Sequence, residues 1–483
     1  MTKRRDFISK GLIGSAGVAF GSFAFKPGNF SSLIENFGSV YANKILKPVV
    51  EAEEEVYQYL PADNGAGPMW CGGSTCIVRI GKEVFASGLE TVPERKPLNN
   101  CRWMLLGRSK KGWVKKHIDM EGRTREPSPI AVFHDGRFFL SANPTLTAPD
   151  TYNGPARPEI LQFKKSDDKM KFGRLLPVWS GNPPFTEHSY RSLAADGNAG
   201  ELILFQNIEY THAEWSFLDS KGKWSAQGKL EWPFGSDYEE PEPIRVCYPN
   251  VMLKDRAVYF CGVSDIIEPK KQWRKFKRKL TGKEWDYDFR RLFFTWSDDI
   301  TTGKFHQWLE ITSREETCGW IFPADLWAAP DRSIHILWTE RALDERLREK
   351  FFPGQKQSHA LNYAIIRDGK VELRRTLAIA EEGVSDLIPG PARFHITPEN
   401  RLFVVYFIKG TDASGRPVAE NRLAEIMPDG NPGTSVALHL KQPFSSFFTA
   451  TVRAGSKPSP TLDMLGILNG VKNTISYARI RLE

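Results

Sequence analysis

One unit of four short strands recurs along the chain, and it constrains the fold more than any other feature. In its clearest copy, residues 188–230, the turn Asp196-Gly197-Asn198 joins two strands, 189–195 and 201–208. A third strand and a fourth that begins at Trp224 follow. The same order of strands and turns recurs in seven stretches of roughly 40 to 70 residues. These stretches are residues 74–116, 127–179, 188–230, 244–312, 320–380, 391–439 and 445–482.

The two ends of the chain are complementary. The last stretch offers only three strands. Residues 50–60 near the N-terminus alternate partly, as in a strand or a short helix, and as a strand residues 50–59 would supply the missing fourth. Four strands in a unit of this length are typical of a propeller blade, and closing the ring removes exposed sheet edges. We therefore predict an all-β protein with one seven-bladed β-propeller domain, residues 43–483, whose ring is closed by an N-terminal strand that completes the last blade. Two β-sandwiches in tandem fit the strand count but leave these end strands unexplained.

Residues 1–42 have the pattern of an export signal. Arg4 and Arg5 are adjacent, Phe7 follows, and a weakly apolar run rich in Gly, Ala and Ser fills residues 11–25. This pattern is typical of a twin-arginine signal peptide, and the run is too short to span a bilayer comfortably. Val40-Tyr41-Ala42 suits cleavage, with small or tolerated residues at the required offsets. We therefore expect a protein without a membrane anchor that is exported folded to the periplasm or secreted.

The six cysteines show no spacing of a zinc site. A twin-arginine substrate folds in a reducing compartment, so we expect mostly free thiols, with Cys71 and Cys76 as the pair best suited to an exception. A metal cofactor is possible in this structural class, but no ligand set can be read from the sequence.

The charge favours an anionic partner. The formal net charge is +8, and the chain contains 14 Trp and 31 Phe. No nucleic-acid recognition fold is evident, so nucleic acid is not expected as a partner. An anionic polysaccharide or oligosaccharide suits the charge and the aromatic side chains, which stack on sugar faces. We expect the protein to act as a monomer.

A long basic connection interrupts the fourth unit. Strands are expected at residues 246–253, 257–263 and 289–296, with a run of Lys and Arg between the last two. Trp273, Phe276 and Leu280 have helical spacing. The pattern predicts a helix packed on the ring, with Arg274 turned inward and the lysines turned outward. An enlarged loop on a rigid scaffold is a common place for function.

Two kinds of sequence segment resemble a known group of proteins. The turn-and-Trp segments at residues 218–224 and 297–308 resemble degenerate Asp-boxes of sialidase-like propellers. EHSYRSLAAD (187–196) and the block 262–293 resemble exported bacterial proteins with BNR repeats. Their nearest characterised relatives are the seven-bladed ulvan lyases and the propeller rhamnosidases that act on rhamnose–glucuronate linkages. The resemblance covers the mature chain as architecture, and it implies a polysaccharide lyase that cleaves a uronate-containing, ulvan-like glycan, with or without sulfate, by β-elimination.

The resemblance to the ulvan lyases implies a pair of His, a Tyr and an Arg as catalytic residues. Arg neutralises the uronate carboxylate, His or Tyr takes the neighbouring proton, and Tyr protonates the leaving oxygen. In this sequence we expect these residues to be His188, His212, Tyr248 and Arg274. In a propeller, ligands usually meet the face at which the innermost strands begin. Substrate-binding residues are expected to be Tyr190, Arg191, Arg245, Tyr259, Trp273, Trp320 and Arg393, with Tyr259 also a reserve for Tyr248.

Other functions stay open. A glycoside hydrolase of the rhamnosidase or sialidase-like kind needs paired carboxylates or a Tyr nucleophile with three arginines, and no carboxylate pair stands out among Asp265, Glu268, Asp286, Asp288, Asp325 and Glu340. A non-catalytic glycan-binding propeller is the third alternative. Among the remaining histidines, His134 is expected in a surface turn, and His335 and His395 in packed strands.

Overall fold

The structure, a computed structural model, describes residues 46–149, 151–165 and 170–483. The expected export signal and its cleavage site, residues 1–42, lie outside the described residues. Residues Lys47–Glu483 form one compact unit. In the described part of the chain, no helix combines the length and the apolar character that a membrane crossing needs.

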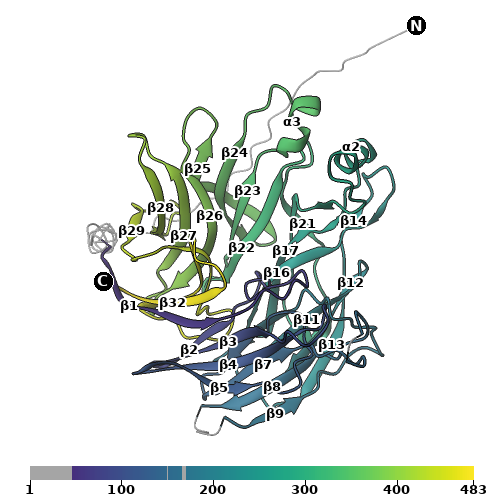
Figure 1. The fold of residues 1–483 in the computed structure, drawn as a ribbon, viewed down its shortest axis with the longest axis vertical. Helices are drawn as coiled ribbons and strands as arrows, with labels where there is room; N and C mark the ends of the chain where they lie inside the picture. Colours follow the sequence, from purple (N-terminus) through teal and green to yellow (C-terminus); the bar gives the residue numbers. More distant parts are fainter. Residues whose placement is uncertain (1–45, 150, 166–169) are drawn as a thin grey trace, which may run out of the picture. The chain divides into compact units, whose positions relative to one another are not determined.

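Seven four-stranded antiparallel sheets, the blades, lie within this unit (Figure 1). Blade 1 contains β2 (Ile77–Ile80), β3 (Glu83–Thr91), β4 (Cys101–Ser109) and β5 (Gly112–Ile118). Blade 2 contains β6 (Ile130–Val132), β7 (Arg137–Ala142), β8 (Glu159–Lys164) and β9 (Phe172–Leu175). Blade 3 contains β10 (Ser192–Asp196), β11 (Glu201–Ile208), β12 (His212–Leu218) and β13 (Trp224–Glu231). Blade 4 contains β16 (Val246–Lys254), β17 (Ala257–Ser264), β20 (Arg291–Ser297) and β21 (Leu309–Ser313).

The last three blades have the same order of strands. Blade 5 contains β22 (Trp320–Ala328), β23 (Ile334–Arg341), β24 (Ser358–Arg367) and β25 (Lys370–Glu381). Blade 6 contains β26 (Ile388–Ile396), β27 (Leu402–Thr411), β28 (Pro417–Ile426) and β29 (Val436–Leu438). Blade 7 contains β30 (Phe444–Thr449), β31 (Thr461–Leu468), β32 (Thr474–Leu482) and β1 (Pro48–Gln58). Two short ribbons, β14 (Phe234–Gly235) with β15 (Glu242–Pro243) and β18 (Ile266–Ile267) with β19 (Tyr287–Asp288), and a 3-10 turn at Ile300–Thr302 extend this scaffold.

The ring is closed between the two ends of the unit. The innermost strands contact one another in the order β2, β6, β10, β16, β22, β26, β30 and back to β2. β1 pairs antiparallel with β32, from Pro48 opposite Leu482 to Gln58 opposite Thr474, and the two strands lie side by side in purple and yellow in Figure 1. The predicted seven-bladed, all-β architecture and its closure by an N-terminal strand are therefore confirmed.

The burial of each strand follows its place in the blade. β11 is buried along its whole length, because an inner strand is covered by the neighbouring blades on both faces. The outermost strand of the same blade, β13, alternates between partly buried and exposed positions. These two patterns come from strands of one blade, and together they give it an apolar inner half and a polar rim.

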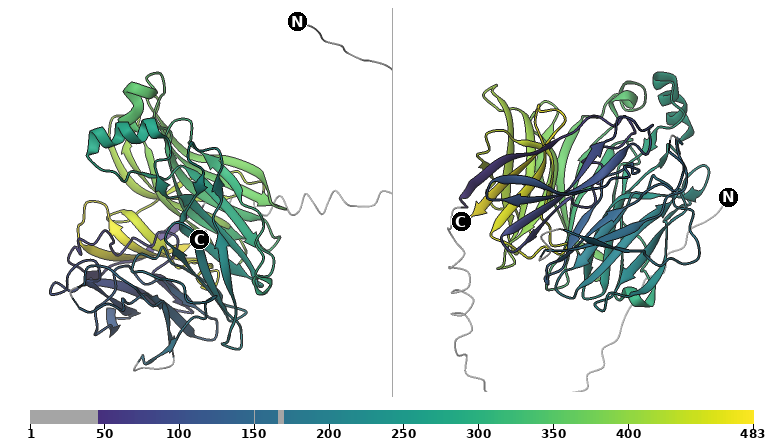
Figure 2. Two further views of the ribbon diagram at one scale, coloured as in Figure 1. Left: turned by 90° about the vertical axis from the view of Figure 1, so that its right-hand side faces the viewer. Right: turned by 60° about the horizontal axis from the view of Figure 1, so that its bottom comes forward.

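The basic connection of blade 4 forms helix α2 (Lys271–Thr281), which contacts α3 (Glu345–Phe351) of blade 5. Figure 2 shows the two helices next to each other in both views. The helix is as predicted, but the predicted inward orientation of Arg274 is wrong, because Arg274 is exposed and Lys277 is buried. The cause is the buried carboxylate of Glu268, whose Oε2 accepts a 2.7 Å hydrogen bond from Lys277 Nζ. Trp273 is buried on the same side, as predicted.

All six cysteines are buried free thiols. Cys71 and Cys76 lie nearest to one another, with 3.6 Å between their sulfur atoms. Both belong to the segment 70–76, which passes against the start of β16. An added Cβ at Gly73 would lie 2.2 Å from the Pro249 carbonyl oxygen. Only a glycine permits this approach of two backbones.

Candidate functional site

Four aromatic side chains meet at the face of the propeller where the innermost strands begin. The centroid of the half-buried Trp70 ring lies 5.2 Å from that of His188, 4.8 Å from that of Tyr190 and 5.9 Å from that of Tyr248. We call these four residues the aromatic seam. His188 and Tyr190 precede β10 of blade 3, and Tyr248 lies at the start of β16 of blade 4. The seam therefore joins two neighbouring blades, and the preceding segment covers it with Trp70.

Both tyrosines of the seam have a left-handed backbone. The φ angle is 40° at Tyr190 and 51° at Tyr248. This region is unfavourable for a bulky side chain and costs about 1–3 kcal/mol for each residue. At Tyr248 a register shift between Cys247 and Asn250 accompanies it. The two ring centroids are 5.1 Å apart. Such backbone conformations occur disproportionately at functional sites, where the surrounding structure holds them.

Burial keeps both phenols protonated. Desolvation raises the pKa of Tyr190 and of Tyr248 well above the usual value of a phenol. Each hydroxyl is therefore a neutral donor at physiological pH. A group of this kind is suited to give a proton to a leaving oxygen.

His188 faces a buried carboxylate. Its Nδ1 lies 3.2 Å from Glu126 Oε1, and the side chain is 32% exposed. Burial raises the pKa of Glu126, but His188, Arg191 and the bonds from Ser189 outweigh this effect, and the pKa is lowered. The ionised Glu126 attracts an N–H at Nδ1. The tautomer that results has a free lone pair at Nε2, where it is able to accept a proton.

Arg191 and Arg245 are both held by the protein. Arg191 Nη2 donates to the Pro127 carbonyl at 2.7 Å, and its Nη1 lies 3.9 Å from Glu126 Oε2. Arg245 Nη2 lies 2.9 Å from Asp265 Oδ2, and its Nε donates to the Asp265 carbonyl at 2.9 Å. Both side chains are buried. They therefore hold the walls of the seam in place, and their charges are already balanced.

Arg245 also orders two more tyrosines. Its guanidinium carbon lies 3.9 Å from the ring centroid of Tyr210 and 5.7 Å from that of Tyr287. The two hydroxyl groups are 2.9 Å apart, and burial together with this bond raises the pKa of Tyr210 to about 12. Tyr210 is 40% exposed, so its ring edge is accessible to a ligand beside the seam.

A cavity of about 500 Å³ adjoins the seam and is lined by residues of blades 5, 6 and 7. Trp70 belongs to both the seam and the cavity wall. The ring centroid of Phe322, also in the cavity wall, lies 4.9 Å from that of Tyr248. Trp320 is stacked on Phe322 at 5.4 Å and 14°. The polar lining residues are Thr339, Glu340, Arg341, His359, Arg393 and Ser446. Of the predicted binding residues, Trp320 and Arg393 therefore line this cavity. Arg393 donates to the carbonyls of Gly72, at 2.9 Å, and Ala324, so it secures the wall.

Three other predicted residues lie apart from the seam. His212 begins β12, two strands outward from β10, and its Nε2 is 3.1 Å from Glu214 Oε1. Arg274 is on the exposed side of α2, where its charge acts on Glu240 and Glu242. Trp273 is buried against Phe352, at a centroid distance of 5.5 Å.

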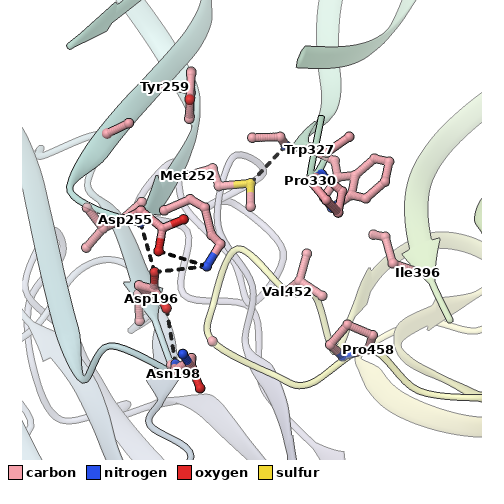
Figure 3. A pocket seen from close by; sticks show the side chains of 18 of the residues that line it. Asp196, Asn198, Met252, Asp255, Tyr259, Trp327, Pro330, Ile396, Val452 and Pro458 are labelled. Atoms are coloured by element: carbon pink, nitrogen blue, oxygen red, sulfur yellow. Dashed lines mark hydrogen bonds and ion pairs between the residues drawn. The ribbon is translucent and has the colours of Figure 1, made fainter. Parts of the chain in front are cut away.

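Tyr259 lies at the opposite end of blade 4, close to the turn between β16 and β17. It lines a second cavity of about 640 Å³ (Figure 3). In this view Asp196, Asn198 and Asp255 lie on one side and an apolar wall that includes Trp327 on the other. The polar side is paired internally, because Asp196 Oδ2 accepts from the Asp255 amide at 3.0 Å and lies 3.5 Å from Lys254 Nζ. The exposed His134 also lines it, and His335 and His395 are packed with hydrogen-bond partners.

Sequence reasoning missed three residues of this face: Trp70, Glu126 and His359. Gly72 and Gly73 after Trp70 are a usable signal, because paired glycines often mark a close approach of backbones. No comparable signal exists for the others. Within residues 46–149, 151–165 and 170–483, no group of three or more His, Cys, Asp or Glu is placed to hold a metal ion.

Comparison with known proteins finds solved structures that share the fold. No family model matches the chain. A search of curated proteins also gave no match. Among solved structures, the chain is similar to a PL25 ulvan lyase bound to -[GlcA(1-4)Rha3S]-, with a TM-score of 0.53, 10% identity, and coverage of 89% of this chain and 95% of that one. A second structure of a PL25 ulvan lyase gives the same values. At this identity the likeness shows the fold alone.

Proposed function

We propose that this protein is an exported polysaccharide lyase that cleaves an anionic, uronate-containing glycan by β-elimination. The observation that carries the proposal is the meeting of His188 and Tyr248 around Trp70. One group is oriented to accept a proton, the other is a neutral phenol, and both lie beside an aromatic face. The export signal expected from residues 1–42 and the net charge of +8 agree with an extracellular anionic polymer.

The proposed step uses two protein groups. His188 Nε2 takes the proton from the sugar carbon beside the carboxylate, and the electron pair left there forms a double bond to the next ring carbon. The bond from that next carbon to the glycosidic oxygen breaks. The Tyr248 hydroxyl protonates the leaving oxygen. His188 then releases its proton to water while Tyr248 takes one up from water, so both groups return to their starting states. Trp70 offers a ring face on which a sugar stacks, and Glu126 holds the His188 tautomer.

His212 and Arg274 remain predictions in this scheme. Arg274 lies on the exposed side of α2. We propose that it binds the polymer away from the cleaved bond. For His212, whose Nε2 is engaged by Glu214, we propose a supporting role at the edge of the site.

The chemistry distinguishes this proposal from a hydrolase. A hydrolase of the two-carboxylate kind needs two accessible carboxyl groups across one bond. Glu126 and Asp265, two carboxyl groups beside the seam residues, are both buried and are paired with Arg191 and Arg245. The carboxyl groups therefore do not favour two-carboxylate hydrolysis over elimination at the seam.

The test is incubation with glucuronate-containing glycans while following the ultraviolet absorbance of an unsaturated uronate product. We expect absorbance to rise, and His188→Ala and Tyr248→Phe to lower kcat by about 10²–10⁴-fold. Tyr152→Phe, at a tyrosine that is 63% exposed, is the matched control and should keep full activity. New reducing ends without absorbance would establish a hydrolase instead, and binding without any cleavage would establish a glycan-binding propeller.

A further inference from the structure

The cavity beside the seam contains an arginine that has no carboxylate partner among the described residues. Arg341 is the last residue of β23, and its side chain is partly exposed. In the described part of the chain it makes no side-chain hydrogen bond or ion pair, and its buried Nε is left without an acceptor. Buried donors without a partner are rare in folded proteins. A free guanidinium that lines a cavity is therefore a marker of an anionic ligand.

The nearest carboxylate in sequence does not serve Arg341. Glu340 Oε1 accepts a hydrogen bond from Arg314 Nη2, and Glu340 Oε2 accepts one from Trp338 Nε1 at 3.1 Å. Both oxygens of Glu340 are thus engaged away from Arg341. The other arginines of this face are held differently, Arg245 by Asp265 and Arg393 by backbone carbonyls. Arg341 is therefore the cation in this cavity whose N–H donors are available to a ligand.

A neutral histidine stands opposite. His359 of β24 is the cross-strand partner of Arg341, and both line the cavity. Burial lowers the pKa of His359, and the charge of Arg341 lowers it further, while Glu345 acts in the opposite direction. Near neutral pH the cavity therefore carries the charge of Arg341, and the imidazole adds a neutral hydrogen-bonding group. This pair is suited to one oxyanion on a sugar.

Aromatic and proline surfaces frame the pair. Trp320 is the other cross-strand partner of Arg341, and its ring is stacked on Phe322. Pro389 and Pro391 line the opposite wall. Because Trp70 belongs to both the cavity and the seam, a glycan with one sugar at the seam is able to place a neighbouring sugar here. A flat apolar wall with a cation at its edge is the environment that an acidic sugar requires.

We propose that Arg341 and His359 form an oxyanion subsite that binds a carboxylate or a sulfate ester of a glycan sugar next to the seam. The anion specificity of the protein then resides in blade 5. The choice of polymer rests on the proposed function, whereas the anion subsite does not require cleavage.

The test is calorimetric titration of the full-length protein with oligosaccharides of alternating glucuronate and 3-sulfated rhamnose. All proteins compared carry Tyr248→Phe, whose lowered kcat limits turnover during the titration, and the chain with Arg341 intact serves as the wild type at that position. Replacing Arg341 by Met should raise Kd by about 10- to 100-fold. Arg332→Met is the matched control, because Arg332 lies at the opposite end of the same blade and is exposed. Its Kd should not change.

Further titrations identify the anionic group that is bound, and a further variant tests whether Arg341→Met is still folded. If desulfated oligosaccharide abolishes the difference between the wild type and Arg341→Met, the ligand group is a sulfate ester. If carboxyl-reduced oligosaccharide abolishes it, the group is a carboxylate. Arg341→Lys, which keeps the charge, should recover part of the affinity and report on folding. Absence of binding by the wild type, or equal Kd values for the wild type and Arg341→Met, would overturn the inference. Binding that depends on Arg341 without an unsaturated product would refute only the lyase proposal.

Discussion

Arg453 Nε donates to Asp325 Oδ1 at 2.7 Å, and this contact joins blade 7 to blade 5 across the centre of the ring. The same guanidinium donates to Asn250 Oδ1 of blade 4 and to the Gly73 carbonyl, both at 3.0 Å. Arg453 and Asp325 side chains are 3% and 0% exposed. One buried cation therefore fixes three blades and the segment that carries Trp70.

Replacing Arg453 by Met should strongly destabilise the fold. The change leaves Asp325 as a buried charge without its partner, and such a loss costs roughly 3–5 kcal/mol. The free energy of unfolding, measured by urea denaturation, should fall by that amount. Arg416→Met removes a paired arginine whose side chain is 80% exposed, so its midpoint should stay close to that of the wild type. Equal midpoints for the two variants would show that the central contact is not important for stability.

Gly73→Ala should displace Trp70 from the seam. The added Cβ would lie within 3 Å of the backbone of Tyr248 and Pro249, which is unable to yield as a side chain does. We expect about 1–3 kcal/mol of destabilisation and a loss of glycan affinity, measured by urea denaturation and by titration. Gly67→Ala, in the same stretch, meets nothing within 4 Å and should change neither quantity. If Gly73→Ala retains full affinity, the position of Trp70 is not needed for binding.

The fold was readable from the sequence because its determinants are local. Each unit contains its own turn residues and its own strands with alternating apolar residues. The predicted strands 201–208 and 474–482 coincide with β11 and β32. The strand without a partner at each end identified the closure. Loop conformation was less accessible. The spacing of Trp273, Phe276 and Leu280 predicted the helix, but the buried Glu268 selects Lys277 for the inner face, and Leu280 is 54% exposed.

The site was only partly readable, for a physical reason. His188 and Tyr248 were found because they stand where innermost strands begin, which is a property of sequence position. The freedom of Arg341 depends on Arg314 engaging Glu340, a contact between residues 26 apart in sequence. A free arginine and a paired one look identical in a sequence, so only the tertiary structure separates them.

Glu268→Gln should loosen α2. Burial raises the pKa of Glu268, but Arg290 and Lys277 outweigh burial and lower it to about 2, so the group is ionised throughout the physiological range. Gln leaves two buried cations with one fewer anion, at a cost of roughly 3–5 kcal/mol. Trypsin should then cut faster at the many Lys and Arg of α2. Glu284→Gln removes a partner from an exposed pair with Arg278 and should leave the cleavage rate unchanged. Equal cleavage rates in the two variants would contradict this anchoring.

His395→Gln should make the protein less sensitive to acid. Burial lowers the pKa of His395 to about 4, and its Nε2 is 2.8 Å from the Ser459 carbonyl oxygen, to which a Gln amide is able to donate. The unfolded chain binds this proton near pH 6.5, so the wild type is fully stabilised above about 6.5 and loses the contribution as the pH falls towards 4. Between pH 7 and 4.5, its free energy of unfolding should fall by on the order of 2 kcal/mol more than that of the variant. Urea denaturation at a series of pH values measures the difference, with the exposed His439→Gln as the control that keeps the wild-type profile. Parallel profiles for His395→Gln and the wild type would show that His395 does not titrate on unfolding.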